Sequence, residues 1–294
     1  MEGRVLKIIR SAIGCMASWG FIEELQKLGV EVIGVDADFW SYAFNLLDKY
    51  YVIPEATNGR FIKSLFGIAK YENVDAIISG PEEELLVLSK WRKSFEDEGI
   101  MILCPSYESI MTCYDKLKMN KFLRKIFIPI PRLGSGDLYT RTITKPRFGR
   151  GGKGNIEHSI IQEYIDGIEY SVDVLADKEG NTLNIVPRIR EKVVNGKSVV
   201  SKTTYDKDII DYTKKIVKRL KLFGPSCIQC IKNDSGVYFI DINPRFGGGS
   251  ILSIKADPTI LPNLIRLIKG EKPIPNNTFK EGLTMLRYYK EVYI

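Results

Sequence analysis

Apolar positions in the first third of the chain alternate between a strand-like and a helix-like period. Short apolar runs at residues 5–9, 30–35, 76–79 and 100–103 are typical of buried strands, and helical patterns end at Leu28 and span residues 82–98. Strands that alternate with helices build parallel βαβ units. The pattern therefore predicts a parallel open sheet with covering helices over residues 1 to about 110.

Segments that contain polar residues follow several of these predicted strands, at positions 11–14, 36–38 and 79–84. In a parallel open sheet such positions share the rim beyond the carboxyl ends of the strands, where ligands bind. The first turn contains only one glycine, Gly14, so the dinucleotide-binding fingerprint is absent and an NAD-type domain is disfavoured.

The pattern changes from about Thr112 onward. A helical stretch at residues 116–125 ends before a proline-containing break at 129–131, and short alternating segments follow it. The predicted strands are residues 140–145, 160–163, 170–175, 183–186, 226–231 and 237–242. This half is expected to be α+β with largely antiparallel pairing, so the chain should join an α/β domain to an α+β fold.

Composition narrows the class of protein. A hydrophobic share of 44% supplies a sizeable core for 294 residues, and no apolar run approaches the roughly 20 residues that span a bilayer. The N-terminus runs directly into a strand-like segment and has no signal-peptide pattern, so we expect a cytoplasmic protein without a membrane partner. The five scattered cysteines suit a reducing compartment, and with one histidine in the chain the pair Cys227 and Cys230 lacks the further ligands of a zinc site.

The net charge of +7 is spread along the chain. No run of five or six basic residues occurs, and lysines such as Lys214, Lys215 and Lys218 lie on an amphipathic helix where a solvated face explains them. Nucleic acid is therefore not expected as a partner. A basic excess also suits a protein that binds a nucleoside triphosphate.

A predicted hairpin brings three oxygen-bearing side chains together. Residues 233–236, Asn-Asp-Ser-Gly, form a strong turn signal, and pairing about that turn places Gln229 opposite Asp241. Asp241 and Asn243 then project from the same strand face. Such a set suits a hard divalent ion that bridges substrate phosphates, and Arg245 beyond Pro244 adds a positive charge for a phosphoryl group. The alternative is a polar strand end with a structural turn.

A glycine-rich basic run follows the strand predicted at residues 140–145. Four glycines within residues 149–154 would let backbone amides approach phosphate oxygens, while Lys145 and Lys153 neutralise charge. The spacing is not that of a Walker P-loop. The alternative is a flexible surface turn.

The segment at residues 160–173 is first apolar, then acidic and turning, then alternating. A strand that leaves a connector in this way exposes backbone groups from Glu163 to Ile165 that could contact an adenine edge, and Glu169 could accept from ribose hydroxyls. A sheet edge with solvated acids would have the same pattern.

Together these motifs resemble the ATP-grasp superfamily in their order along the chain. The motifs are Lys116 in Tyr-Asp-Lys-Leu, the Thr-Lys-Pro run with its glycine loop, Gln-Glu-Tyr-Ile-Asp-Gly-Ile-Glu-Tyr at 162–170, and Asp-Ile-Asn-Pro-Arg-Phe-Gly-Gly-Gly-Ser at 241–250. The branch containing the carbamoyl-phosphate synthetase large chain is the most similar. Segments at residues 35–38, 48–54, 79–84 and 286–293 also resemble that branch, so the resemblance covers nearly the whole chain.

The resemblance implies three parts and an ATP- and magnesium-dependent ligase (Mg²⁺ or Mn²⁺). The parts are a pre-ATP-grasp domain at residues 1–111, a small lobe at 112–185 and a large lobe with the metal site at 186–294. The implied chemistry is activation of a substrate carboxylate as an acylphosphate, which an amine or another nucleophile captures. The residues implied in ATP binding are Lys116 and Lys145 at the phosphates, Gly151, Gly152, Lys153 and Gly154 above them, Glu163, Tyr164 and Ile165 at the adenine, Glu169 at the ribose, Gln229, Asp241 and Asn243 at the metal, and Arg245 at the γ-phosphate.

Anion-holding groups that ATP does not use are candidates for the small-molecule acid. Arg188 and Arg190 lie on one strand face, and the loop at residues 247–250, with Gly248, Gly249 and Ser250, offers backbone amides beside Arg245. Arg245, Lys145 and Arg188 are the expected catalytic set. At the rim of the first domain, Ser11 and Glu84 are expected to receive the nucleophile.

One departure from the family keeps a second function open. Only five residues separate Gly154 from Ile160, where relatives usually have a helix-containing insertion, so the small lobe is trimmed. The alternative to a ligase is therefore a non-catalytic ATP-binding subunit or sensor that needs a partner. A homodimer stays open as well.

Overall fold

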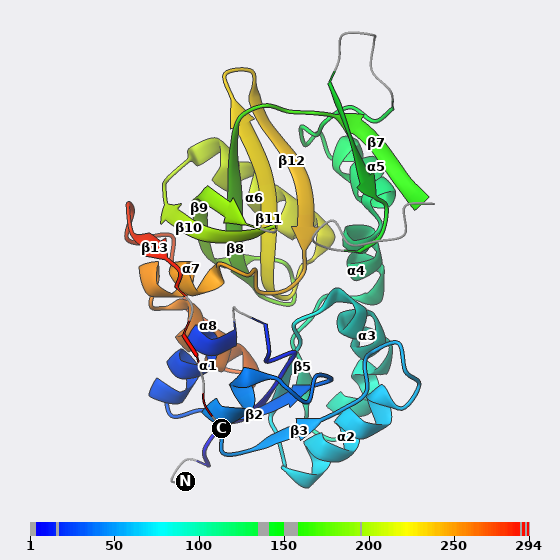
Figure 1. The fold of residues 1–294 in the computed structure, drawn as a ribbon, viewed down its shortest axis with the longest axis vertical. Coiled ribbons are helices and arrows are strands. Elements are labelled where there is room, and N and C mark those ends of the chain that lie inside the picture. The colour runs from blue at the N-terminus through cyan, green and yellow to red at the C-terminus, as the bar shows by residue number, and fades with distance from the viewer. Residues whose placement is uncertain are drawn as a thin grey trace.

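The computed structural model describes residues 4–15, 18–134, 141–149, 158–194, 196–288, 290–291 and 293. Figure 1 shows a lower body built around one parallel sheet and an upper body built around a larger antiparallel sheet, with a small two-stranded sheet beside it. The N-terminal third forms most of the lower body, as the hydrophobic pattern predicts.

The lower sheet is parallel, with the strand order β3-β2-β1-β4-β5 among the described residues. Its strands are mostly apolar and buried because helices cover both faces. Its elements are β1 (Lys7–Ser11), α1 (Ser18–Lys27), β2 (Glu31–Asp36), η1 (Tyr42–Leu46), β3 (Tyr50–Val52), α2 (Phe61–Tyr71), β4 (Ala76–Ile78), α3 (Glu82–Glu96) and β5 (Met101–Ile102). The expected parallel sheet is confirmed.

Alternate residues of β1 belong to different cores. Ile8 packs with α1 and with the C-terminal helix α8 (Ile260–Lys269), whereas Ile9 packs with α2 and α3. In Figure 1 the orange C-terminal helices lie against the blue N-terminal segment. The C-terminal region therefore completes the core of the N-terminal sheet, a contact that the linear pattern did not indicate.

The upper sheet has the order β12-β11-β8-β9-β10-β13 and antiparallel pairing throughout its described strands. Its elements are β8 (Ile168–Ala176), β9 (Thr182–Val194), β10 (Lys197–Thr203), α6 (Lys207–Leu220), β11 (Gly224–Asn233), β12 (Gly236–Asn243), α7 (Ser250–Ala256) and β13 (Thr284–Leu286). One face packs on α6 and on α5 (Lys116–Lys125), which follows α4 (Tyr107–Tyr114). The opposite face carries the buried polar residues of the site described below.

The small sheet consists of β6 (Thr142–Pro146) paired antiparallel with β7 (Ser159–Glu163). It is tied to the start of α5 by an ion pair of 2.7 Å between Arg147 and Asp115. Asp115 also caps α5, because its Oδ1 accepts from the backbone N–H groups of Leu117 and Lys118. One carboxylate therefore fixes both the helix that begins at Lys116 and the strand that carries Lys145.

Two features of the upper body differ from the sequence-based expectation. The prediction omits β10 and β13 and ends β9 too early; β10 contains register shifts that disturb its alternation, and β13 has three residues. The expected lobe boundary after residue 185 lies inside β9, and β8 belongs to the same sheet as β11. Alternation identifies a strand but not the sheet that it joins.

Two further observations concern the cysteines and the membrane. All five cysteines are free thiols, and Cys227 and Cys230 are buried on β11. Within the described residues, no helix has the length and apolar character needed to cross a bilayer.

Candidate active site

The hairpin of β11 and β12 aligns the expected metal ligands. Gln229 pairs with Asp241, as expected, and Asn243 follows Asp241 on the same face. The turn does not set this pair by itself, because a β-bulge between Gln229 and Cys230 shifts the partner of Gln229 from Ile240 to Asp241. The Asn243 amide nitrogen lies 3.1 Å from Asp241 Oδ2. The structure therefore brings this trio together at one end of the hairpin.

The orientation of the Gln229 amide bears on whether a cation fits. One polar atom of this amide lies 3.3 Å from Asp241 Oδ2 and the other lies 3.1 Å from Arg190 NH1. If the amide oxygen points toward Asp241, two hydrogen-bond acceptors face each other, and a divalent cation between them would stabilise this arrangement. If the amide is turned over, its nitrogen donates to Asp241 and its oxygen accepts from Arg190. The set contains one carboxylate and two amides, and no group of three His, Cys, Asp or Glu side chains in the described part of the chain offers another metal site.

Lys145 interacts electrostatically with Asp241 of this trio and with Lys116. The Lys116 ammonium donates to the Gly149 carbonyl at 3.0 Å, where the glycine-rich run begins. Burial lowers the pKa of Lys145, and Lys116 lowers it further, whereas Asp241 and Glu169 raise it. The charge of Lys145 on the small sheet thus interacts with Lys116 and with Asp241 and Glu169 of the large sheet.

Part of the expected phosphate loop lies outside the described residues. Gly149 is described, whereas Gly151, Gly152, Lys153 and Gly154 are not.

The expected adenine segment lies at the end of β7. The Glu163 carboxylate pairs with Arg132 at 3.2 Å, which lowers the pKa of Glu163. The backbone N–H of Glu163 donates to the Arg132 carbonyl at 2.8 Å. The Tyr164 N–H donates to the Arg141 carbonyl, and the Arg141 guanidinium lies 4.3 Å from the centre of the Tyr164 ring. Ile165 follows directly in the connector to β8. Arg132 and Arg141 therefore hold the segment against the small sheet.

Glu169 and Arg190 form an ion pair across β8 and β9. Arg190 also donates to the Gly196 carbonyl at 2.8 Å. The residue expected at the ribose and one of the residues expected at the acid thus contact each other.

Arg245 links the metal trio to the N-terminal domain. Its guanidinium donates to Asn243 Oδ1 at 3.1 Å and pairs with Glu82 of α3 at 2.8 Å. Burial opposes the charge, but Glu82 and Asp241 help to hold the pKa of Arg245 above its ordinary value. The positive charge expected at the γ-phosphate is therefore present at the end of β12.

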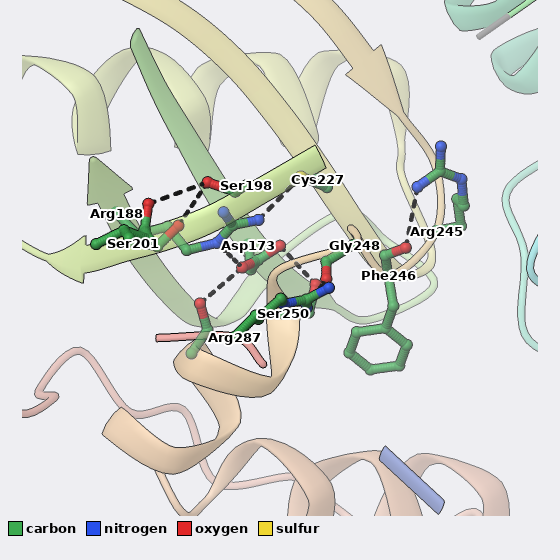
Figure 2. Close-up of polar contacts among 12 residues, drawn as sticks. Asp173, Arg188, Ser198, Ser201, Cys227, Arg245, Phe246, Gly248, Ser250 and Arg287 are labelled. Carbon is green, nitrogen blue, oxygen red and sulfur yellow. Dashed lines mark hydrogen bonds and ion pairs between the residues drawn. The ribbon is translucent and has the colours of Figure 1, made fainter. Parts of the chain in front are cut away.

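Arg188 has a different surrounding from the one expected. Its side chain is buried, and its Nε donates to Asp173 Oδ2 at 2.8 Å (Figure 2). The same carboxylate accepts from Ser250 at 2.7 Å and Ser253 at 2.6 Å, and the charge of Arg188 with these bonds lowers the pKa of Asp173 despite burial. Arg188 therefore anchors the start of α7 through Asp173, whereas the sequence suggested that it holds a substrate anion.

Close packing explains part of the glycine loop before α7. A Cβ added to Gly249 would lie 2.5 Å from Arg188 NH1, whereas one added to Gly248 would meet no atom within 4 Å. The Gly248 carbonyl accepts a hydrogen bond from Arg287. The loop at residues 247–250 thus packs against Arg188 at Gly249 and accepts a hydrogen bond from Arg287 at Gly248.

The rim of the N-terminal sheet lies beside Arg245, which pairs with Glu82 of α3. Ser11 donates to Glu84, and Ser79 donates to the same carboxylate oxygen at 2.8 Å. Burial raises the pKa of Glu84. Ser11 and Glu84 therefore lie together at the carboxyl ends of β1 and β4, as the parallel topology predicts.

Sequence reasoning missed three residues near the site. Asp173 is the buried carboxylate that accepts from Arg188. Arg10 is buried, donates to the Ile78 carbonyl at 3.1 Å and lies near Arg245. Arg287 donates to the Gly248 carbonyl. An ionisable residue inside an apolar strand, as Arg10 and Asp173 are, was the available signal.

A cavity of about 510 Å³ lies elsewhere, between α3, α4 and the carboxyl end of α6. None of the expected site residues lines it. The site is identified by its charges and not by this cavity.

Comparison with known proteins agrees with the observed architecture. Residues 113–249 match the family model of the ATP-grasp domain, and residues 17–103 match that of the PylC-like N-terminal domain. The tyramine–L-glutamate ligase of Methanocaldococcus jannaschii is 30% identical over 218 residues, which cover 71% of this chain and 67% of that protein.

Solved structures share the fold at low identity. A biotin carboxylase from Campylobacter jejuni, solved as a β,γ-ATP complex, has a TM-score of 0.70 and 17% identity over 93% of this chain and 72% of that chain. The biotin carboxylase domain of Hydrogenobacter thermophilus 2-oxoglutarate carboxylase, solved as a dimer with MgADP, ADP and bicarbonate, has a TM-score of 0.71 and 17% identity over 96% and 74% of the two chains. The family matches and the ligase relative show that this chain belongs to the ATP-grasp family of ATP-dependent ligases and has a PylC-like N-terminal domain.

Proposed function

We propose that this ligase phosphorylates a carboxylate of a small acid with ATP and transfers the acyl group to an amine. The observation that carries the proposal is the convergence of Lys145, Asp241 and Arg245, which come from the small sheet and from the end of the large-sheet hairpin. Positive charges beside a metal-competent trio suit phosphoryl transfer, in which positioning and charge neutralisation provide most of the acceleration.

The proposed reaction has two steps. A carboxylate oxygen of the acid attacks the γ-phosphorus, the bond to the β–γ bridging oxygen breaks, and ADP leaves. The amine nitrogen then attacks the acyl carbon, inorganic phosphate leaves, and the nitrogen loses a proton. The product is an amide.

We assign the chain's own residues as follows. Lys116, Lys145 and Arg245 bind phosphate oxygens, and Gln229, Asp241 and Asn243 hold the divalent ion. A bound Mg²⁺ supplies further neutralisation of phosphate charge. The segment from Glu163 to Ile165 contacts the adenine, Glu169 contacts the ribose once Arg190 releases it, and Ser11 and Glu84 receive the amine. The glycine run 151–154 is proposed to cover the phosphates.

The domain division is proposed with one change from the sequence-based boundaries. Residues 1–111 form the N-terminal domain, and the small lobe ends before β8, because β8 and β9 belong to the large sheet. ATP is proposed to lie between the small sheet and the large sheet.

The ligase relative suggests the first substrates to test. Its name describes a ligase of tyramine and L-glutamate. We propose an amino acid or a related small acid as the acyl donor and a primary amine as the acceptor, with L-glutamate and tyramine as the first pair.

Purified protein with ATP and Mg²⁺ should release ADP and phosphate only when an acid and an amine from a broad panel are both present. The double variant Asp241→Ala and Asn243→Ala should lose this turnover and keep its fold. Asp234→Ala, at the exposed opposite end of the same hairpin, is the matched control and should retain turnover. Full activity in the double variant would disprove the metal assignment, and tight ATP binding without turnover across the panel would favour the non-catalytic subunit.

A further inference from the structure

Arg287 differs from Arg188, Arg190 and Arg245 in its charge partners. Arg188 pairs with Asp173, Arg190 pairs with Glu169, and Arg245 pairs with Glu82. The described residues provide no carboxylate within 4 Å of the Arg287 guanidinium, whose hydrogen bond goes to the Gly248 carbonyl. A half-buried cation without a counter-charge is costly unless an anion arrives.

The influences on the pKa of Arg287 also indicate that no nearby carboxylate stabilises its positive charge. Burial lowers the pKa of Arg287, and the nearby Arg188 lowers it further. The opposing influences come from Cys15 in the loop after β1 and from Tyr42, the first residue of η1 after β2. Arg287 therefore lies near the segments that follow β1 and β2 at the rim of the N-terminal sheet, as well as beside the glycine loop.

Arg287 and Arg245 contact the same short loop. Arg245 NH1 donates to the Phe246 carbonyl at 3.1 Å, and Arg287 donates to the Gly248 carbonyl (Figure 2). Because Phe246 and Gly248 are only two residues apart, both guanidinium groups are held by one short stretch of the loop.

We propose that Arg287 binds a second anionic group of the acid substrate while the reacting carboxylate lies at the Arg245 side of the loop. This inference rests on the proposed function and deepens it, because it defines the acid as one with two anionic groups, such as a dicarboxylate or an acidic amino acid. Arg287 can form a bidentate contact with a carboxylate, which fixes the orientation of the acid and selects which end reacts. The Gly248 carbonyl positions the guanidinium for this contact.

The test combines changes in the substrate and in the protein. With L-glutamate and its two monoamides as probes, wild-type protein should use the better monoamide about tenfold to a hundredfold less well than the diacid, by kcat/KM, as expected for a lost charge-assisted hydrogen bond. In Arg287→Gln the kcat/KM for the diacid should fall by a similar factor, whereas the kcat/KM for the monoamide should change little. The preference for the diacid should therefore disappear. Arg287→Lys should restore part of it.

Controls separate binding of the acid from other effects. The KM for ATP should stay within about twofold in Arg287→Gln, and Arg60→Gln, an exposed arginine at the start of α2, should leave all constants unchanged. Circular dichroism and thermal unfolding check that each variant folds. A preference for the diacid that persists in Arg287→Gln would overturn the inference.

A binding measurement distinguishes failure of the inference from failure of the proposed function. Calorimetry with a non-hydrolysable ATP analogue and Mg²⁺ should show binding of L-glutamate, or of another three- to six-carbon dicarboxylate, to wild type and weak binding to Arg287→Gln. If this Arg287-dependent binding occurs without turnover, the ligase function fails and the inference holds. If no dicarboxylate binds, or if monocarboxylates bind equally well, the inference is overturned.

Discussion

Glu82 and Arg245 form an ion pair that joins the two bodies of the molecule. The distance between Glu82 Oε1 and Arg245 NH2 is 2.8 Å, and both side chains are largely shielded from solvent. Glu82 begins α3 at the rim of the N-terminal sheet, whereas Arg245 follows the hairpin with the proposed metal ligands. The position of the N-terminal domain is thereby coupled to the arginine proposed to bind the γ-phosphate.

Removing the charge of Glu82 should weaken this coupling. Glu82→Gln is expected to lower the free energy of unfolding by about 1.5–3 kcal/mol, because a hydrogen-bonded charge on Arg245 loses its partner. Urea unfolding measures this change. Glu96→Gln, at the exposed end of the same helix, is the control, and equal stability of the two variants would contradict the assigned role of the pair.

Lys145 should matter for nucleotide affinity more than for stability. Burial lowers its pKa, so replacing its ammonium by an apolar group of similar length removes a desolvation cost as well as a phosphate contact. Lys145→Met is expected to weaken ATP binding about tenfold to a hundredfold with little loss of stability. Calorimetric titration with ATP and Mg²⁺ checks this, with Lys121→Met on the exposed side of α5 as the control. Unchanged ATP affinity in Lys145→Met would remove Lys145 from the phosphate site.

Gly249 and Gly248 form a matched pair for testing the loop. In Gly249→Ala the new methyl group would lie 2.5 Å from Arg188 NH1, and Arg188 is held by Asp173, so we expect a destabilisation of about 1–3 kcal/mol. Gly248→Ala meets no atom within 4 Å and should change the free energy of unfolding by less than about 0.5 kcal/mol. Chemical denaturation of both variants provides the comparison. Similar stabilities would show that Arg188 moves aside easily.

Glu84 should give a recognisable pH dependence. Its pKa is raised in the fold, chiefly by burial, while bonds from Ser11 and Ser79 and the charge of Arg10 lower it and Asp36 raises it. Between the unfolded and folded pKa values the folded state binds more protons, so Glu84 makes stability fall as pH rises through that window. Its penalty is absent below the unfolded pKa and complete above the folded pKa. Glu84→Gln should remove this part of the pH dependence in urea unfolding from pH 4 to pH 8, and an unchanged profile would contradict the burial argument.

The sequence alone could predict the elements because their signals are local. The apolar runs of β1, β2 and β4 and the helical period of α5 require only neighbouring residues, and the structure confirms them. The shared strand face of Asp241 and Asn243 was predictable for the same reason. The pairing of Gln229 with Asp241 also needs a β-bulge between Gln229 and Cys230, since the turn alone would place Gln229 opposite Ile240.

Only the tertiary structure decided which charges neutralise each other and which arginines, such as Arg287, have no carboxylate of the described residues within ion-pair distance. Arg188 and Arg190 have the same period-two relationship in sequence, but Arg188 is buried against Asp173 and Arg190 pairs with Glu169. The pairing of Arg245 with Glu82, the packing of α8 on the first sheet and the contact between Arg287 and Gly248 join segments far apart in the chain. The sequence pattern by itself determined the hairpin of β11 and β12 and the shared face of Asp241 and Asn243, because turn signals and strand period are local properties. The fold determined which arginines pair with a carboxylate, because burial and charge pairing depend on distant partners.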